Sequence, residues 1–166
     1  MQMGLGFGRA ALGAAALACG LAATPAWAED GALAVVEGYL AAWNAHDAAA
    51  AAAFFADDVT YYDASVGAPV SGREAAQTDI IESFLNAVPD ASWQMSGAPV
   101  VNADAVAFEW TFAGTNTGDW GDGTAATGKP FTLHGLSLIR VEDGKIAYQG
   151  DYYDALGFYG QLGLLE

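Results

Sequence analysis

With 166 residues, the chain is long enough for one domain with its own core, and 54% of its residues are hydrophobic, which excludes an intrinsically disordered protein. Acidic residues number 20 against 5 basic ones, so the formal net charge is −15. Because nucleic acids and anionic lipids bind to basic patches, this composition excludes both as partners.

The N-terminal segment has the pattern of a secretory signal peptide. Arg9 precedes an apolar run over residues 10–23, and the small-x-small sequence Ala26-Trp27-Ala28 follows. The run is too short and too rich in alanine for a membrane span. We therefore expect cleavage after Ala28, export to the periplasm or the medium, and a mature domain of residues 29–166 that leaves the membrane.

The single cysteine, Cys19, lies inside this segment. Leu17-Ala18-Cys19 keeps lipoprotein attachment through Cys19 open as an alternative, although the leucine lies one position late for the usual pattern. On the main interpretation the mature chain has no cysteine, hence neither a disulfide nor thiol chemistry. Cleavage removes one basic residue and no acidic one, which leaves a net charge of −16.

Two helices are predicted at the start of the mature chain. From a start near Asp30, apolar residues recur at helical spacing at Leu33, Val36, Leu40 and Trp43. Asp47 is placed to cap a second, alanine-rich helix over residues 48–55. A β-branched and aromatic strand follows at residues 59–62.

A third helix is predicted after the turn at residues 67–69. Ser71 and Glu74 have the spacing of a capping box, and the apolar stripe of this helix is Ile80, Ile81, Phe84 and Leu85. Pro89 ends it.

The rest of the chain predicts antiparallel strands at about residues 93–101, 105–114, 130–141 and 145–153. Asp143-Gly144 between the last two is a strong hairpin signal. The glycine-rich stretch 114–128 is a long loop. Three helices followed by a curved antiparallel sheet make an α+β fold.

Several short motifs along the mature chain resemble the nuclear transport factor 2-like superfamily, and in particular SnoaL-like polyketide cyclases and ketosteroid isomerases. They are residues 39–47, FADDV at 55–59, SGRE at 71–74, TGK at 127–129, EDGKI at 142–146, and YD at 153–154 followed by QLG at 161–163. The resemblance implies a cone-shaped roll, also described as cystatin-like, in which N-terminal helices pack on a strongly curved antiparallel sheet. It further implies a homodimer and a pocket for a small hydrophobic molecule, but the superfamily includes both enzymes and binding modules.

The same resemblance suggests catalytic residues. Tyr39 lies where the isomerases have their oxyanion-hole tyrosine, and Asp63 where they have their general base. The isomerases carry a second, protonated aspartate on the strand before the hairpin, where this chain has Leu136 and Ser137 and no acid. In SnoaL-like cyclases the acid–base aspartate lies on the last strand, where Asp151 is the better match and Asp154 the competitor.

Epoxide hydrolases of the same superfamily pair such an aspartate with an arginine and a second aspartate on the preceding strands. The strand at residues 105–114 contains Glu109 and Trp110 and no arginine, which disfavours epoxide hydrolysis.

His134 is a further candidate for acid–base chemistry. A simple two-residue turn at Asp143-Gly144 pairs Leu136 with Asp151, so that His134 lies opposite Tyr153 and diagonal to Asp151 on one face. An aspartate there could orient and tune the imidazole as a proton relay. The alternatives are a buried structural histidine, and a three-residue turn that moves Asp151 to the other face.

Aromatic residues are expected to line the pocket and favour a flat, apolar ligand: Trp43, Tyr61, Trp110 and Tyr153, with Trp120 over the mouth, on the surface or in a dimer contact. Two distant histidines make no metal site, and no nucleotide-binding motif occurs, so we expect neither metal nor cofactor. The sequence favours an exported isomerase or cyclase in which Asp63 removes a proton, Tyr39 stabilises the oxyanion, and His134 with Asp151 donates or relays protons. The alternative is a non-catalytic binding or dimerisation module of the same fold.

Overall fold

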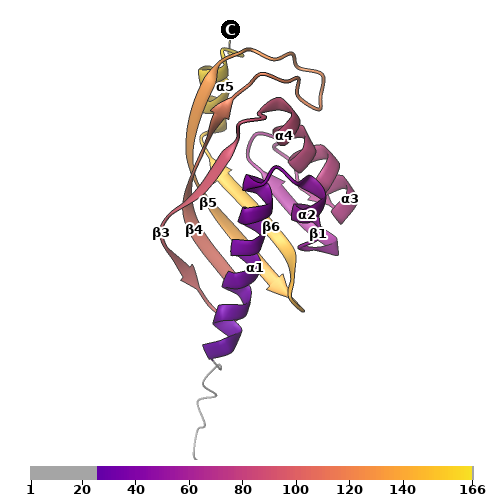
Figure 1. Cartoon of the computed structure of the whole chain (residues 1–166), viewed down its shortest axis with the longest axis vertical. Coiled ribbons are helices and arrows are strands. Elements are labelled where there is room, and N and C mark those ends of the chain that lie inside the picture. The colour runs from indigo at the N-terminus through magenta and orange to yellow at the C-terminus, as the bar shows by residue number, and fades with distance from the viewer. Residues whose placement is uncertain (1–25, 166) are drawn as a thin grey trace, which may run out of the picture.

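The computed structural model describes residues 26–165, in which a curved six-stranded sheet carries helices on one face (Figure 1). The helices near the N-terminus are α1 (Ala26–Asn44) and α2 (Ala48–Ala52), and α3 (Arg73–Ala75), η1 (Ala76–Glu82) and α4 (Ser83–Ala87) form one continuous rod. The strands are β1 (Phe55–Asp63), β2 (Val70–Ser71), β3 (Ser92–Val101), β4 (Ala105–Thr115), β5 (Pro130–Glu142) and β6 (Lys145–Tyr153), and α5 (Ala155–Leu162) ends the fold.

The strands lie in the order β2-β1-β6-β5-β4-β3. All neighbours are antiparallel except β1 and β6, which run parallel and bring the first strand beside the last. The predicted strand ranges are confirmed to within two residues for β3 to β6. This is the predicted α+β cone, with an unclosed and mostly antiparallel sheet.

Helix α1 packs on the concave face of the sheet through the predicted stripe. Val36, Leu40 and Trp43 are buried, and Tyr39 is fully buried with them. At its end, Asn44 binds both backbone groups of Trp93: Nδ2 donates to the carbonyl at 2.7 Å and the Trp93 amide donates to Oδ1 at 2.9 Å. These two bonds fix the end of the helix on β3.

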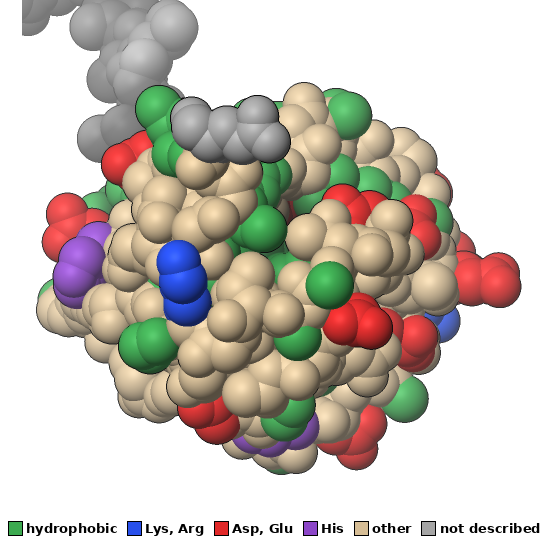
Figure 2. All heavy atoms as spheres, turned by 90° about the horizontal axis from the view of Figure 1, so that it is seen from above, with side chains coloured by type: hydrophobic (Ala, Val, Ile, Leu, Met, Phe, Trp, Pro, Cys, Tyr) green, Lys and Arg blue, Asp and Glu red, His purple; other side chains and the backbone are tan. Residues whose placement is uncertain are grey.

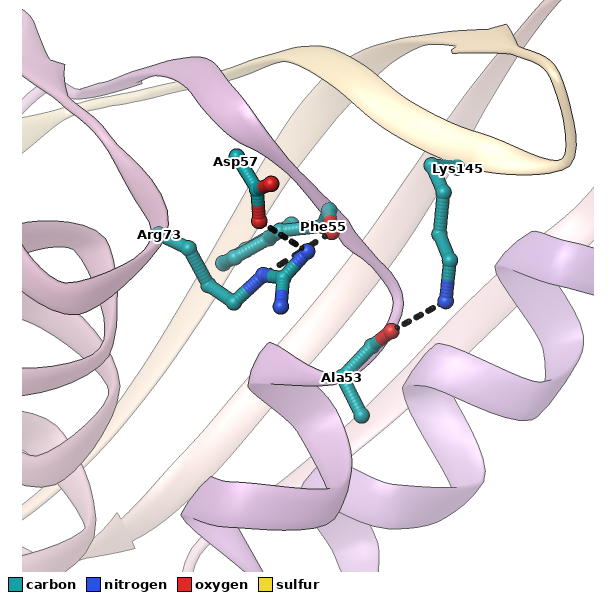
Figure 3. Close-up of polar contacts among 5 residues, drawn as sticks. All are labelled: Ala53, Phe55, Asp57, Arg73 and Lys145. Atoms are coloured by element: carbon teal, nitrogen blue, oxygen red, sulfur yellow. Dashed lines mark hydrogen bonds and ion pairs between the residues drawn. The ribbon is translucent and has the colours of Figure 1, made fainter.

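Helix α2 begins as predicted and ends earlier than predicted. The Asp47 carboxylate caps it by accepting from the amide of Ala50 at 2.9 Å. The expected continuation to residue 55 is wrong, because Phe55 pairs with Ile146 and opens β1. Two basic side chains fasten this junction (Figure 3): Lys145 Nζ donates to the Ala53 carbonyl at 2.7 Å, and Arg73 donates to the Phe55 carbonyl and pairs with Asp57.

The third helix has two features that the sequence pattern did not predict. The capping box is not formed, because Ser71 belongs to β2 and Gly72, at φ 92°, is the residue before the helix without any side-chain cap. Its middle turns form a π-helix, in which Gln77 donates to Glu82 five residues later at 2.7 Å. This wider winding buries the adjacent residues Ile80 and Ile81 completely, and the helix ends at Ala87, before Pro89.

The β5–β6 hairpin has the predicted two-residue turn, with Asp143 and Gly144 at φ 49° and 73°. Val141 pairs with Ile146 as predicted, but Arg140 pairs with Tyr148, so Ala147 is an extra residue in β6. From this bulge onward every pairing is shifted by one residue. The predicted pair of Leu136 with Asp151 is therefore wrong: Asp151 lies opposite Ser137.

The long loop between β4 and β5 is organised by one buried side chain. Asn116 Nδ2 donates to the carbonyls of Ala87 and Gly118 at 3.1 and 2.8 Å, and its Oδ1 accepts from the amide and hydroxyl of Thr127. The loop is thereby tied to the end of α4.

The predicted signal peptide, with Cys19, lies outside the described residues, apart from Ala26 to Ala28 in the first turn of α1. Within residues 26–165, the helices are all too short or too polar to cross a membrane.

Candidate active site

A small, mostly apolar cavity lies between the concave face of the sheet and the helices. Its volume is about 30 Å³, which is space for about two water molecules. Eleven side chains from α1, η1, α4 and all strands but β2 line it: Trp43, Tyr61, Asp63, Ile80, Phe84, Trp93, Trp110, Phe112, Leu133, Asp151 and Tyr153. The two aspartates are the acidic groups among them.

Asp151 is the most constrained group of the cavity wall. Its Oδ2 accepts from the Tyr61 hydroxyl at 2.7 Å and from Gln149 Nε2 at 2.9 Å, and its Oδ1 accepts from Ser137 Oγ at 2.5 Å. Trp110 Nε1 in turn donates to Ser137 Oγ at 2.9 Å. The carboxyl group is therefore held in one orientation by neighbouring strands on both sides.

Burial changes the acidity of this group. Desolvation and the neighbouring Asp63 charge raise the pKa of Asp151 from 3.8 to about 7, although the donors from Ser137, Tyr61 and Gln149 lower it. Asp151 can therefore hold or release a proton near neutral pH.

Asp63 is the last residue of β1, and its two carboxylate oxygens differ in their hydrogen bonds. Its Oδ1 accepts from the Ser65 amide and hydroxyl at 2.8 and 2.7 Å, from the Tyr153 hydroxyl at 2.8 Å and from the Val66 amide at 3.3 Å. Its Oδ2 has no such partner among the described residues. Burial raises the pKa of Asp63, whereas these hydrogen bonds lower it. One oxygen thus anchors the group, and the other is left free to act.

The two carboxyl groups are neighbours on parallel strands, since Asp63 is paired with Asp151 in the β1–β6 register. Adjacent strands lie about 5 Å apart, and paired residues point to the same face. Two carboxylates so placed in an apolar environment disfavour ionising together. At neutral pH the pair favours one charged and one protonated member.

Four buried polar atoms beside the cavity lack a hydrogen-bond partner within residues 26–165: Tyr39 Oη, Trp43 Nε1, Trp93 Nε1 and Gln149 Oε1. Three of them are donors, and their rings touch one another, with centroids 5.4 Å apart for Trp43 and Trp93 and 6.0 Å for Tyr39 and Trp93. Buried donors are nearly always paired in native proteins. The Tyr39 hydroxyl lies beside the side chains of Trp43 and Gln149, so these atoms form one polar cluster behind the cavity wall.

Residues 36–149 match the family of SnoaL-like domains, a match over more than half of the chain. The chain belongs to the SnoaL-like domain family. Among solved structures, this SnoaL-like protein is similar to AclR from Streptomyces galilaeus, a suggested hydroxylase, with 25% identity and a TM-score of 0.69 over 83% of this chain and 99% of that one.

Two further structures are similar at the same level. TsrD from Streptomyces laurentii is 26% identical, with a TM-score of 0.69 over 82% of this chain and 97% of that one. A suggested polyketide cyclase from Xanthomonas campestris is 26% identical, with a TM-score of 0.68 over 81% and 98%. No protein with a curated description matches the chain.

Of the four predicted catalytic residues, the structure brings Asp63 and Asp151 into the cavity wall. Tyr39 lies behind that wall and packs between Trp43, Phe55 and Trp93. Burial and the Asp151 charge raise the pKa of its phenol well above the ordinary value, so its hydroxyl remains a donor. The competitor Asp154 is exposed and caps α5 by accepting from the Gly157 amide.

The predicted position of His134 is wrong. The bulge at Ala147 places Gly135, and not His134, opposite Tyr153. His134 is exposed on the outer face of the sheet, where its Nδ1 lies 3.2 Å from the Thr111 hydroxyl oxygen. A proton relay between His134 and Asp151 is therefore not formed.

Four of the five aromatic residues that were expected to line a ligand pocket do line the cavity: Trp43, Tyr61, Trp110 and Tyr153. The indole of Trp110 lies over Gly135, where any side chain would collide with it. Trp120 is the exception: it packs on Phe84 and Phe158 at the end of the molecule and does not line the cavity.

Three residues with polar side-chain atoms at the site were not predicted: Trp93, Ser137 and Gln149. Gln149 precedes Asp151 by two positions, and side chains two apart in a strand share a face, so this residue was open to prediction. Ser137 was not, because its position opposite Asp151 depends on the bulge. Within the part of the chain that the structure describes, no cluster of side chains could hold a metal ion.

Proposed function

We propose that this SnoaL-like protein is an acid–base catalyst of the isomerase or cyclase type, acting without a cofactor on a small hydrophobic carbonyl compound. The observation that supports this proposal is the pairing of Asp63 and Asp151, side by side in an apolar cavity. Removal of a proton beside a carbonyl group needs a base and a donor to the developing oxyanion, and adjacent groups with separated pKa values can supply them.

Asp63 is the proposed base. The donors on Oδ1 fix its orientation, and the unpartnered Oδ2 can accept a proton from a carbon acid bound in the cavity. A raised pKa makes it a stronger base than an exposed carboxylate.

Asp151 is the proposed acid. With a pKa of about 7 it is protonated in a large share of molecules at neutral pH. The resemblance places the protonated aspartate of the isomerases on β5, and in this chain Asp151 offers one on the neighbouring strand β6. If the Gln149 amide turns over, its unpartnered Oε1 comes to lie 2.9 Å from Asp151 Oδ2 and accepts a hydrogen bond from the protonated carboxyl group.

The indole and phenol donors beside the cavity are proposed to stabilise the oxyanion. Trp43 and Trp93 line the cavity with unpartnered Nε1 groups, and Tyr39 lies directly behind them. Neutral donors aimed at a developing negative charge in a dry site are an effective source of transition-state stabilisation. Since the cavity has room for about two waters, a substrate must displace side chains, and buried Phe84 separates the cavity from a hollow at the surface.

The test is deuterium exchange. The mature protein is incubated with a panel of cyclic ketones and β-keto esters in D₂O, and loss of the acidic C–H signal is followed by NMR. We expect Asp63→Asn to slow the catalysed exchange by about 10²–10⁴-fold, and Asp104→Asn, on an exposed turn, to leave it unchanged. Equal rates for wild type and Asp63→Asn across the panel would refute the proposal.

The small volume of the cavity favours a second candidate, a binding module without catalysis. It predicts saturable binding of an apolar ketone, unchanged by Asp63→Asn, with no exchange above the buffer rate. Binding with exchange that depends on Asp63 would contradict it.

We also propose export and dimer formation. Export predicts that the protein recovered from periplasm or medium begins at residue 29, which intact mass measures.

A homodimer through the outer face of the sheet is supported by exposed Leu136 and Tyr152, at 43% and 45% accessibility. Leu136→Glu should then give a monomer in light scattering, whereas a wild-type monomer would refute the dimer.

A further inference from the structure

A second and larger hollow lies at the end of the molecule, outside the cavity. It is bounded by η1 and α4, by the loop after β4 and by α5, and has a volume of about 590 Å³. This is the size of a site for a small organic molecule. Figure 2 looks down on this end and shows apolar surface in a hollow, with acidic side chains to one side.

The floor of this outer groove is aromatic. The rings of Phe84, Trp120 and Phe158 form one cluster, with centroids 5.2 Å apart for Phe84 and Trp120 and 5.7 Å for Trp120 and Phe158. The Nε1 of Trp120 is buried and has no partner in the described part of the chain. Because Phe84 and Phe158 are only 7% and 2% exposed, the partly exposed Trp120 ring supplies most of the aromatic surface of the groove.

The rim of the outer groove is acidic. Asp79, Glu82 and Asp122 line it, and its lining includes no lysine, arginine or histidine. One oxygen of Glu82 accepts from Gln77 and one of Asp122 accepts from the Thr124 amide, so the second oxygen of each is available. The net charge of −15 adds to the negative potential here.

We propose that the outer groove binds a small organic cation with a flat apolar body, such as an arylalkyl ammonium ion. The aromatic floor buries the apolar body, the carboxylates attract the ammonium group, and aromatic rings add cation–π attraction. An anion of the same shape is repelled. Phe84 lines both the groove and the cavity, but the proposal concerns binding alone and does not depend on catalysis.

The test compares three probes of one shape: naphthylmethyl-trimethylammonium, naphthylmethanol and naphthylacetate. Binding to the mature protein is measured by calorimetry, and the indole N–H signal of Trp120 locates it by NMR. We expect the cation to bind at least about ten-fold more tightly than either other probe, with an advantage that shrinks at high salt.

Two triple variants distinguish the effect of the rim carboxylates on binding from the effect of the overall negative charge. Asp79→Asn with Glu82→Gln and Asp122→Asn should abolish the preference for the cation and leave naphthylmethanol binding unchanged. The matched control, Asp104→Asn with Glu109→Gln and Asp143→Asn, removes three exposed acids elsewhere and should keep the preference. Equal affinity for all probes, no detectable binding, or equal loss in both variants would overturn the proposal.

Discussion

Replacing Asp151 with asparagine should make the protein more stable at alkaline pH and leave its stability unchanged in acid. Asparagine has the size of a protonated aspartate and carries no charge. Its amide can use the same partners, because the hydroxyls of Tyr61 and Ser137 can donate or accept and the Gln149 amide can turn over. The substitution therefore removes the ionisation and little else.

The size of the effect follows from the acidity of Asp151. Its pKa lies at about 7 in the folded protein and at 3.8 in the unfolded chain. Each unit corresponds to about 1.4 kcal/mol, so ionising this group costs roughly 4 kcal/mol of the free energy of unfolding. Between these pKa values the folded state holds a proton that the unfolded state has lost. Stability from this group is therefore complete below pH 4, falls as the pH rises to about 7, and is constant above.

The assay is urea unfolding of both proteins between pH 4 and 9, and the quantity is the difference between their free energies of unfolding. It should be near zero at pH 4 and grow to several kcal/mol in favour of Asp151→Asn by pH 8. Asp104→Asn should give a flat difference. A flat difference for Asp151→Asn as well, or a variant less stable at every pH, would show that the carboxyl group is not held in a desolvated site.

Three other changes test single contacts. Gly135→Ala places a methyl group against the Trp110 indole and should cost about 1–3 kcal/mol of stability, whereas Gly31→Ala, in α1 with open space around it, should raise stability by up to about 1 kcal/mol. Asn116→Ala removes the side-chain donor to the Gly118 carbonyl and the acceptor for the Thr127 amide and hydroxyl, and should cost about 2–4 kcal/mol in urea unfolding; a loss within error would show that the loop is not held by this residue. Tyr61→Phe removes a donor from Asp151 and should raise the pKa of that carboxyl further, and carbon NMR titration showing a lower pKa would contradict the assigned network.

The strands could be predicted from the sequence because their signals are local to each strand or turn. Alternating apolar positions set β4 and β5, and Asp143-Gly144 can adopt the positive φ angles that a tight hairpin needs. The length of α2 was mispredicted because Phe55 serves the parallel pairing with Ile146, a contact 91 positions away along the chain. A local pattern carries no information about such a contact.

The site residues divide in the same way. Asp63 and Asp151 could be assigned from family motifs, and the structure places both in the cavity wall. The predicted partnership of His134 with Asp151 required the correct register over a whole hairpin. One inserted residue changes the face of every side chain beyond it, and nothing in the sequence around Ala147 marks the insertion.

The bulge at Ala147 decides which chemistry this fold can carry. If Ala147 paired with Arg140 instead of forming a bulge, Tyr148, Gly150 and Tyr152 would face the cavity. Asp151 would then lie on the outer face beside His134. With the bulge, Asp151 enters the interior beside Asp63, opposite Ser137, where burial raises its pKa and the neighbouring strands supply donors. Deleting Ala147 should therefore give a regular ladder in which Tyr148 still pairs with Arg140 and Asp151 with Ser137, so the raised pKa of Asp151 should be retained in an NMR titration. A folded deletion variant in which that pKa returns to its ordinary value would show that β6 has slipped by one residue and that the register depends on the bulged backbone itself.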